Sequence, residues 1–303
     1  MNISMNIKFT LKGKARTVAS PHFYHKRSAT LQLMQNLLQV VSFVRTPAPV
    51  RGCTKGMKTM KGSKSTKTAL VLGSGPSADL LITSRVPEFI DDIFVINGFN
   101  NLTIAAEIIP SYYGLSDPAH FGPLESEQLD ERNKILDYVK KCSATLVLPH
   151  TAFGSEVFKN HDKLFFDDRE LTFFNNSISP IRPRGYGSTT IYKMLATACH
   201  FGYQKIYLLG VDNTNFLNYV GRVDNKLSDL GQNTANRKTH SKSSLIQEYE
   251  QEFTSGIAGR MQSYAHLFGD LFKFPSSQII NLHKKSLVDA FPKVDSHPLI
   301  RDS

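Results

Sequence analysis

The sequence has few cysteines and lacks the common short catalytic motifs. Cys53, Cys142 and Cys199 have no paired spacing, so the sequence predicts neither a disulfide scaffold nor a zinc site, and a reducing compartment is expected. The motifs H-E-x-x-H, C-x-x-C, G-x-x-x-x-G-K-S/T and G-x-S-x-G do not occur, which argues against a metalloprotease, a P-loop kinase and an α/β-hydrolase. Also absent is D-x-D, the carboxylate pair that would hold a metal ion on a nucleotide-sugar pyrophosphate.

Acidic side chains are missing from the first part of the chain. Residues 1–67 contain 13 Lys and Arg and no Asp or Glu, whereas 68–303 contain 23 basic and 26 acidic residues, a net charge of −3. The net charge of +10 of the whole chain therefore comes from this basic leader, and the near-neutral remainder gives no support for a nucleic-acid-binding surface. No apolar run reaches the roughly 18–20 residues that a membrane span requires.

The basic leader has three open interpretations. It resembles a transit-type presequence, a basic amphipathic anchor for an anionic membrane surface, or a disordered extension before a start at Met57 or Met60. Residues 51–67 are rich in Gly, Lys, Thr and Ser and are expected to form a linker. We therefore expect a leader over 1–66 and one folded domain over 67–303, in the cytoplasm or peripherally bound to a membrane through the leader.

A glycine-rich turn follows the first predicted strand, 68–72. The turn reads Gly73-Ser74-Gly75-Pro76-Ser77-Ala78 and fits G-x-G-x-x-A, a pattern that is typical of nucleotide-binding α/β units. Pro76 suits the first turn of a helix, and the N–H groups at that helix end would be free to bind a phosphate. The alternative is a strand-to-helix turn that binds no ligand.

Two further predicted strands also end in polar residues. The strand 93–96 ends at Asn97, and the strand 112–115 ends at Ser116-Asp117-Pro118. Ligands bind at the carboxyl ends of parallel strands, so these side chains are candidates for a site, although each alone is also an ordinary loop residue. A dehydrogenase usually has Asp or Glu in the place of Asn97, which argues against NAD.

Residues 183–212 form the most informative block. A turn rich in Gly, Ser and Thr precedes a predicted helix with apolar residues at spacings of three to four, Gly202 ends that helix, and Asp212 follows a predicted buried strand at 205–209. Helices and strands alternate along the chain, which predicts an α/β fold with a parallel sheet.

The remaining elements are less regular. The sequence predicts a helix at 124–141, a strand at 144–148, an irregular region at 150–182 with a short strand at 171–174, a polar loop at 213–241, a helix at 244–271, a strand at 278–282 and a short helix that starts at 285. A loop as long as 213–241 is usually functional or disordered. His240 lies at its end, and an imidazole suits a general base at neutral pH, although a single histidine is often only a surface residue.

Taken together, these motifs resemble glycosyltransferase family 42, the bacterial CMP-sialic acid-dependent sialyltransferases. The resemblance covers about 68–295. It rests on the glycine turn, on Arg85-Val86-Pro87, on Asn97, on the block from Thr190 to Asp212, on His240-Ser241-Lys242 and on Lys285-Ser286-Leu287.

The resemblance implies a Rossmann-like fold of the GT-A variant, with helices on both faces of a parallel sheet and a flexible lid at about 213–241. It implies an inverting, metal-independent transfer of sialic acid from CMP-sialic acid to a terminal sugar hydroxyl of a lipooligosaccharide-type glycan, with an alpha-2,3 linkage. The partners would be the nucleotide-sugar donor and the glycan acceptor, with no cofactor, and the family often forms homo-tetramers.

The resemblance also assigns roles to individual residues. His240 corresponds to the general base, and Tyr219 with Arg184 would stabilise the departing phosphate. The implied donor-binding residues are Gly73, Ser74, Gly75, Pro76, Ser77, Asn97, Asp117, Ser188, Thr189, Thr190, Asp212, Thr214 and Ser286. No metal ligands are implied.

This chain departs from the family pattern at several of these positions. The family has Asn in the place of Ser74 and usually in the place of Asp117. Thr214 replaces the first of two phosphate-binding tyrosines, Tyr219 lies one residue from the register of the second, and Arg184 is displaced. The pairing of Tyr219 with Arg184 is therefore our own hypothesis for the phosphate contacts.

Two alternative functions fit the same motifs. The triplet Ser116-Asp117-Pro118, the glycine turn and the Gly210-Val211-Asp212 strand end are similar to those of pterin-diphosphokinase-like and Maf-type flagellin glycosylation proteins. The altered tyrosine pair would also fit a catalytically inactive protein that binds a nucleotide sugar.

Overall fold

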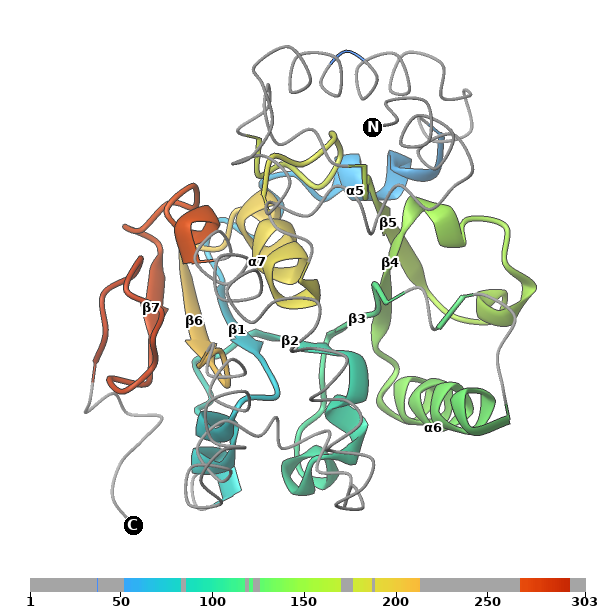
Figure 1. Cartoon of the computed structure of the whole chain (residues 1–303), viewed down its shortest axis with the longest axis horizontal. Helices are drawn as coiled ribbons and strands as arrows, with labels where there is room; N and C mark the ends of the chain where they lie inside the picture. Colours follow the sequence, from blue (N-terminus) through green and yellow to red (C-terminus); the bar gives the residue numbers. More distant parts are fainter. Residues whose placement is uncertain are drawn as a thin grey trace, which may run out of the picture.

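A parallel sheet of seven strands lies at the centre of the protein (Figure 1). The structure, a computed structural model, describes residues 37, 52–82, 86–117, 120–121, 126–169, 177–186, 189–212 and 268–294. The strand order is β5-β4-β3-β2-β1-β6-β7. In chain order the strands are β1 (Thr68–Leu72), β2 (Asp92–Ile96), β3 (Tyr112–Gly114), β4 (Thr145–Pro149), β5 (Lys163–Phe166), β6 (Lys205–Leu209) and β7 (Ile279–Asn281).

The central strand β1 is buried on both faces, which explains its continuous apolar sequence. Leu70 and Leu72 pack into one hydrophobic core, while Ala69 and Val71 pack into the core on the opposite face. Successive strand residues point to opposite faces, so this single run of residues supports both cores. β1 pairs with β6 over its whole length, from Thr68 opposite Lys205 to Leu72 opposite Leu209.

Helical segments cover both faces of the sheet, as the sequence predicts (Figure 1). The helices α5 (Lys55–Thr59) and α7 (Thr190–Phe201) pack on one face. The other face carries α6 (Ser126–Cys142) and the 3-10 segments η2 (Pro76–Ile82), η3 (Asn97–Asn101) and η4 (Thr103–Ala106). Two short 3-10 turns, η6 (His150–Ala152) and η7 (Glu156–Phe158), connect β4 to β5.

The helix α7 ends where the sequence predicts. Gly202 caps it in the left-handed conformation at φ 83°, and its N–H donates to the carbonyls of Ala198 and Cys199. A residue with a Cβ adopts this conformation only with strain, so glycine is the favoured residue here.

Several local predictions are wrong. The region 150–182 is not wholly irregular, because Lys163–Phe166 forms β5 beside β4. The glycine turn leads into the 3-10 segment η2 rather than an α-helix, and the chain at 285 forms a turn rather than the start of a helix. The predicted strand at 171–174 lies outside the described residues, as does most of the predicted helix at 244–271, of which 268–271 are helical.

The segment 52–66 is packed against the sheet layer and does not have the character of the predicted linker. The Met57 side chain is fully buried in the same core as α7. The N–H groups of Gly62 and Lys64 donate to the carbonyls that end α7, at 3.0 and 2.9 Å. The Lys64 ammonium also lies 3.1 Å from the Asp92 carboxylate at the start of β2. These contacts attach the segment to the amino edge of the sheet.

Among helices within the described ranges, none has the length and apolar character that crossing a bilayer requires.

Candidate functional site

The candidate site lies at the carboxyl edge of the sheet, around the central strand β1. β2 lies on one side of β1, and β6, which comes later in the chain, lies on the other. The chain runs from β1 to β2 on one side and from β6 to β7 on the other, so the connections from the adjacent strands β1 and β6 run in opposite directions. Such a switch point is where open parallel sheets bind ligands. The glycine turn after β1, Asn97 after β2, Ser116 after β3 and Asp212 after β6 all belong to this edge.

The turns after β1 and β6 approach each other so closely that glycine is required. A Cβ on Gly73 would lie closer than 3.0 Å to the carbonyl oxygen of Gly210, and Gly210 itself has φ 68°. The N–H groups of Gly73 and Gly75 donate to the carbonyls of Leu209 and Gly210, both at 2.8 Å. The two turns are thus held together by backbone hydrogen bonds.

The Asp212 carboxylate lies against the glycine turn. Its Oδ2 accepts a hydrogen bond of 2.8 Å from the N–H of Ser77, and its Oδ1 lies 2.7 Å from Nδ1 of His283. Asp212 is 3% exposed. This arrangement corrects one expectation, because the N–H of Ser77 binds a carboxylate of the protein itself and is not free for a phosphate. The Ser77 hydroxyl is also engaged and accepts from the N–H of Gly210 at 2.9 Å.

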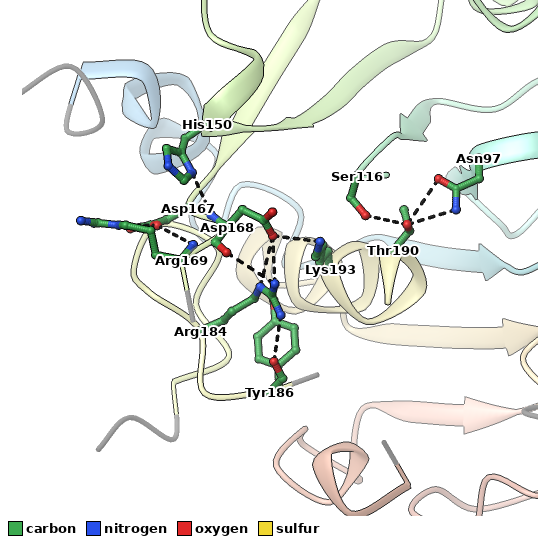
Figure 2. Close-up of polar contacts among 10 residues, drawn as sticks. All are labelled: Asn97, Ser116, His150, Asp167, Asp168, Arg169, Arg184, Tyr186, Thr190 and Lys193. Atoms are coloured by element: carbon green, nitrogen blue, oxygen red, sulfur yellow. Dashed lines mark hydrogen bonds and ion pairs between the residues drawn. The ribbon is translucent and has the colours of Figure 1, made fainter. Parts of the chain in front are cut away.

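Asn97, Ser116 and Thr190 come together at the ends of three different elements (Figure 2). The Thr190 hydroxyl lies 2.6 Å from the Ser116 hydroxyl and 3.1 Å from the amide nitrogen of Asn97. Thr190 occupies the first turn of α7, and both hydroxyl-bearing residues are buried. The structure therefore brings together two of the predicted donor-binding residues, and adds Ser116.

The backbone of Asn97 is in the left-handed region, at φ 41°. The Tyr113 hydroxyl donates to its carbonyl oxygen, and the Thr190 hydroxyl contacts its side chain. Burial raises the pKa of Tyr113 well above its usual range, so this phenol stays a hydrogen-bond donor. Asn tolerates the left-handed region better than most residues, and such conformations are concentrated at functional sites.

The amino end of α7 points into the same edge. Thr189 is its N-cap residue, with no side-chain capping hydrogen bond and no acidic residue in the first turn. In the described structure, the buried hydroxyl oxygen of Thr189 has no hydrogen-bond partner.

A buried group of charges lies beside this helix end (Figure 2). The Asp168 carboxylate is 3.1 Å from the Arg184 guanidinium and 2.8 Å from the Lys193 ammonium, and these two cationic side chains are 2% and 3% exposed. Arg184 also donates to the carbonyl of Tyr186 at 2.9 Å, which holds the chain before α7 in place. The structure thus places Arg184 in an ion cluster with Asp168 and Lys193, and its assignment to the departing phosphate stays a prediction.

An ion pair between Asp167 and Arg169 adjoins this cluster in the sequence. Asp167 accepts two hydrogen bonds from the Arg169 side chain, at 2.9 and 2.6 Å. The N–H of Asp168 donates to Nδ1 of His150 at 3.1 Å. These contacts fix the chain after β5.

Ser286 is placed beside the end of β6, close to Asp212. Its hydroxyl donates to the carbonyl of Val211 at 2.9 Å, and the N–H of Leu287 donates to the carbonyl of Asp212 at 3.1 Å. Of the other predicted residues, Asp117 is exposed at the end of β3, and Ser74 and Pro76 are half-buried in the glycine turn.

Four predicted residues and the predicted lid at 213–241 lie outside the described residues. The four are Ser188, Thr214, Tyr219 and His240. Within the described ranges, no three His, Cys, Asp or Glu side chains are grouped so that they could hold a metal ion.

Sequence reasoning missed three residues of this edge: Asp168, Lys193 and His283. Lys193 had a usable signal, because it is the one charged residue between Ile191 and Ala198 in an otherwise apolar helix. A charge in such a run indicates a buried partner. Asp168 and His283 had no comparable signal, since their partners are distant in the sequence.

The fold and the position of the site define a Rossmann-like α/β protein with its candidate site at a switch point of the sheet. No family model matches the sequence, and no curated protein matches it either. Among solved structures, a Maf glycosyltransferase from Magnetospirillum magneticum AMB-1 is similar, with 18% identity and a TM-score of 0.35. The match covers 54% of this chain and 27% of that chain, so this chain aligns with about a quarter of that protein's length.

Proposed function

We propose that this protein is a glycosyltransferase that takes its sugar from a nucleotide-sugar donor. In the finer form of the proposal, the donor is CMP-sialic acid and the acceptor is a terminal sugar hydroxyl of a glycan. The observation that carries the proposal is the contact among Asn97, Ser116 and Thr190 at the switch point of the sheet. The sequence resemblance supplies the donor and the acceptor class.

The chemistry of these residues suits a polar ligand group that is rich in oxygen atoms. Two hydroxyls and one amide can both donate and accept hydrogen bonds, as the hydroxyl, carboxylate and ring oxygens of a sugar require. The neighbouring amino end of α7 has no capping side chain and no acidic residue in its first turn, so its partial positive charge favours an anionic group of the donor.

The reaction also requires a base for the acceptor hydroxyl. The sequence resemblance assigns this role to His240, which would take the proton as the sugar moves from the phosphate to the acceptor oxygen. The sequence resemblance implies a metal-independent reaction, and the absence of a D-x-D pair agrees with it.

An assay with CMP-sialic acid tests the proposal. The purified chain is incubated with this donor, with and without lactose, and with and without EDTA. We expect CMP release that depends on lactose, survives EDTA and yields sialyllactose. Turnover of ATP to AMP with a pterin would instead favour the diphosphokinase-like alternative, and donor binding without turnover would favour the inactive relative.

A further inference from the structure

An aspartate–histidine pair stands at the carboxyl ends of β6 and β7. Nδ1 of His283 lies 2.7 Å from Oδ1 of Asp212, and the other carboxylate oxygen of Asp212 accepts the N–H of Ser77. The Asp212 side chain is 3% exposed, whereas that of His283 is 26% exposed. The carboxylate is therefore fixed in the interior, and the imidazole lies at the boundary with the solvent.

The backbone holds His283 in this orientation. Its N–H donates to Oδ1 of Asn281 at 3.1 Å, and Asn281 is 1% exposed. Ser286 and Leu287, which follow closely in the chain, bind the backbone carbonyls of Val211 and Asp212. In the described structure no hydrogen bond engages Nε2 of His283. A carboxylate that orients one ring nitrogen and leaves the other available is a recurring arrangement of catalytic histidines.

The position of the Asp212–His283 pair indicates which end of a nucleotide-sugar substrate it would face. Asp212 adjoins the glycine turn and its carboxylate already binds the N–H of Ser77, so a phosphate at this carboxyl edge, where Rossmann-like proteins bind their ligands, would lie outside that contact. A phosphate there would lie near the Asp212 carboxylate, and two anions repel each other. An imidazolium between them removes this repulsion, because both of its ring nitrogens donate hydrogen bonds.

The geometry of an inverting transfer then separates His283 from the acceptor base. The acceptor hydroxyl attacks the sugar on the face opposite the phosphate, so a group beside the phosphate lies on the leaving-group side. We infer that His283, oriented by Asp212, is a catalytic residue that stabilises the departing nucleotide phosphate. This inference rests on the proposed function, and it supplies a phosphate contact where this chain lacks the first tyrosine of the resembling family.

The step is a hydrogen bond to developing charge. The bond between the anomeric carbon and the phosphate oxygen breaks, and its electron pair moves to that oxygen. The Nε2–H group of His283 donates a hydrogen bond to the phosphate as the negative charge grows. The Nδ1–H group keeps its hydrogen bond to the Asp212 carboxylate. The acceptor oxygen forms the new bond to the anomeric carbon, and its proton goes to the separate base.

Two substitutions of His283 test the inference by kinetics. The His283→Leu variant removes both donors, and His283→Gln keeps an N–H close to the place of Nε2. With CMP-sialic acid and lactose, we expect kcat to fall roughly 100- to 1000-fold for Leu, as for loss of one preorganised donor, and less for Gln. His161→Leu, in the loop before β5 at the opposite edge of the sheet, is the control and should keep the wild-type kcat. An unchanged kcat in a folded His283→Leu variant would overturn the inference.

A measurement on the wild-type protein keeps the test independent of any variant's folding. The imidazole nitrogens are observed by NMR while CMP or cytidine is added, and His283→Gln assigns the signals of His283. We expect CMP to shift the Nε2 signal and cytidine, which lacks the phosphate, to leave it in place. Bound CMP without such a shift would overturn the inference. A wild-type protein that binds CMP in this way but transfers no sugar would instead refute the proposed function alone.

Discussion

The hydroxyl oxygens of Ser116 and Thr190 lie 2.6 Å apart, although 74 residues separate the two in the sequence. The contact joins the end of β3 to the first turn of α7. It exists because α7 packs across the sheet and directs its amino end to the carboxyl edge, where the amide of Asn97 completes the group.

Replacing Thr190 tests whether this group binds the donor. Thr190→Val keeps the shape of the side chain but leaves the buried Ser116 hydroxyl without this partner, a cost of about 1–3 kcal/mol in the free energy of unfolding. We also expect CMP-sialic acid binding, measured by calorimetry, to weaken at least tenfold, while Thr190→Ser stays close to wild type.

The matched control is Thr197→Val, about two turns further along α7, where the buried hydroxyl donates to the carbonyl of Lys193 at 2.8 Å. That variant should change stability without changing donor affinity. If Thr190→Val and the wild type bind the donor with equal affinity, the group of Asn97, Ser116 and Thr190 is not part of the donor-binding site.

The ion cluster around Asp168 should be essential for folding. Asp168→Asn would remove the carboxylate that contacts both Arg184 and Lys193, and breaking a buried pair on one side costs about 3–5 kcal/mol. The free energy of unfolding in urea measures this loss. Glu156→Gln is the control, because Glu156 and Lys159 form an exposed pair that should contribute little. Similar stability of the Asp168 and Glu156 variants would contradict the role of the cluster.

Because Gly73 and Gly210 approach each other closely, we expect one added methyl group to lower the stability strongly. In Gly73→Ala, the new Cβ would meet the backbone of Gly210, which cannot move without disturbing the turn after β6. We expect a loss of about 1–3 kcal/mol or more in stability. Gly269→Ala is a suitable comparison, since nothing lies within 4 Å of a Cβ there and the position is helical. It should be neutral or slightly stabilising, and thermal unfolding of both variants decides the point.

Asp92 should make the stability of the protein depend on pH in the acidic range. Burial raises its pKa, but hydrogen bonds from Tyr203 and Lys64 outweigh burial and lower the pKa below 3.8. The carboxylate therefore contributes fully above pH 3.8, and this contribution is lost as the pH falls through the lower pKa of the folded state.

Asp92→Asn should accordingly lower Tm at pH 7, and the difference in Tm from wild type should become smaller below pH 3.8. The same difference at both pH values would show that the charge of Asp92 is not what stabilises the attachment of residues 52–66.

His240 carries a prediction that comes from the sequence alone. If it is the general base, His240→Ala should lose roughly 10²–10⁴ in transfer rate while it still binds CMP. Single-turnover rates and CMP affinity separate these two effects. A variant that transfers sialic acid at the wild-type rate would reject the assignment.

The sequence predicts the sheet well and the charged contacts poorly. β1 and β6 were recognisable because strands buried on both faces are short, apolar and bounded by Gly and polar residues. The edge strand β5 was missed because Lys163–Phe166 has no such pattern and becomes a strand only by pairing with β4. The segment 52–66 looks like a linker in composition, yet Met57 finds a core position that only the assembled α7 creates.

The same limit applies to the site. The family resemblance names both Asn97 and Thr190 as donor-binding residues, and the structure places the two side chains in contact. The pairing of Asp212 with His283 could not be expected, because it depends on β7 lying next to β6 and on the turn that follows it. Such contacts depend on topology and are not visible in the local sequence pattern.

A crystal structure with a non-transferable CMP-sialic acid analogue tests the central proposal most directly. We expect the nucleotide to lie across the carboxyl ends of β1 and β6. Its phosphate should be within hydrogen-bond distance of His283, and its sugar should contact Asn97 and Thr190. A bound analogue at any other edge or face of the sheet, with these three side chains free of ligand, would contradict it.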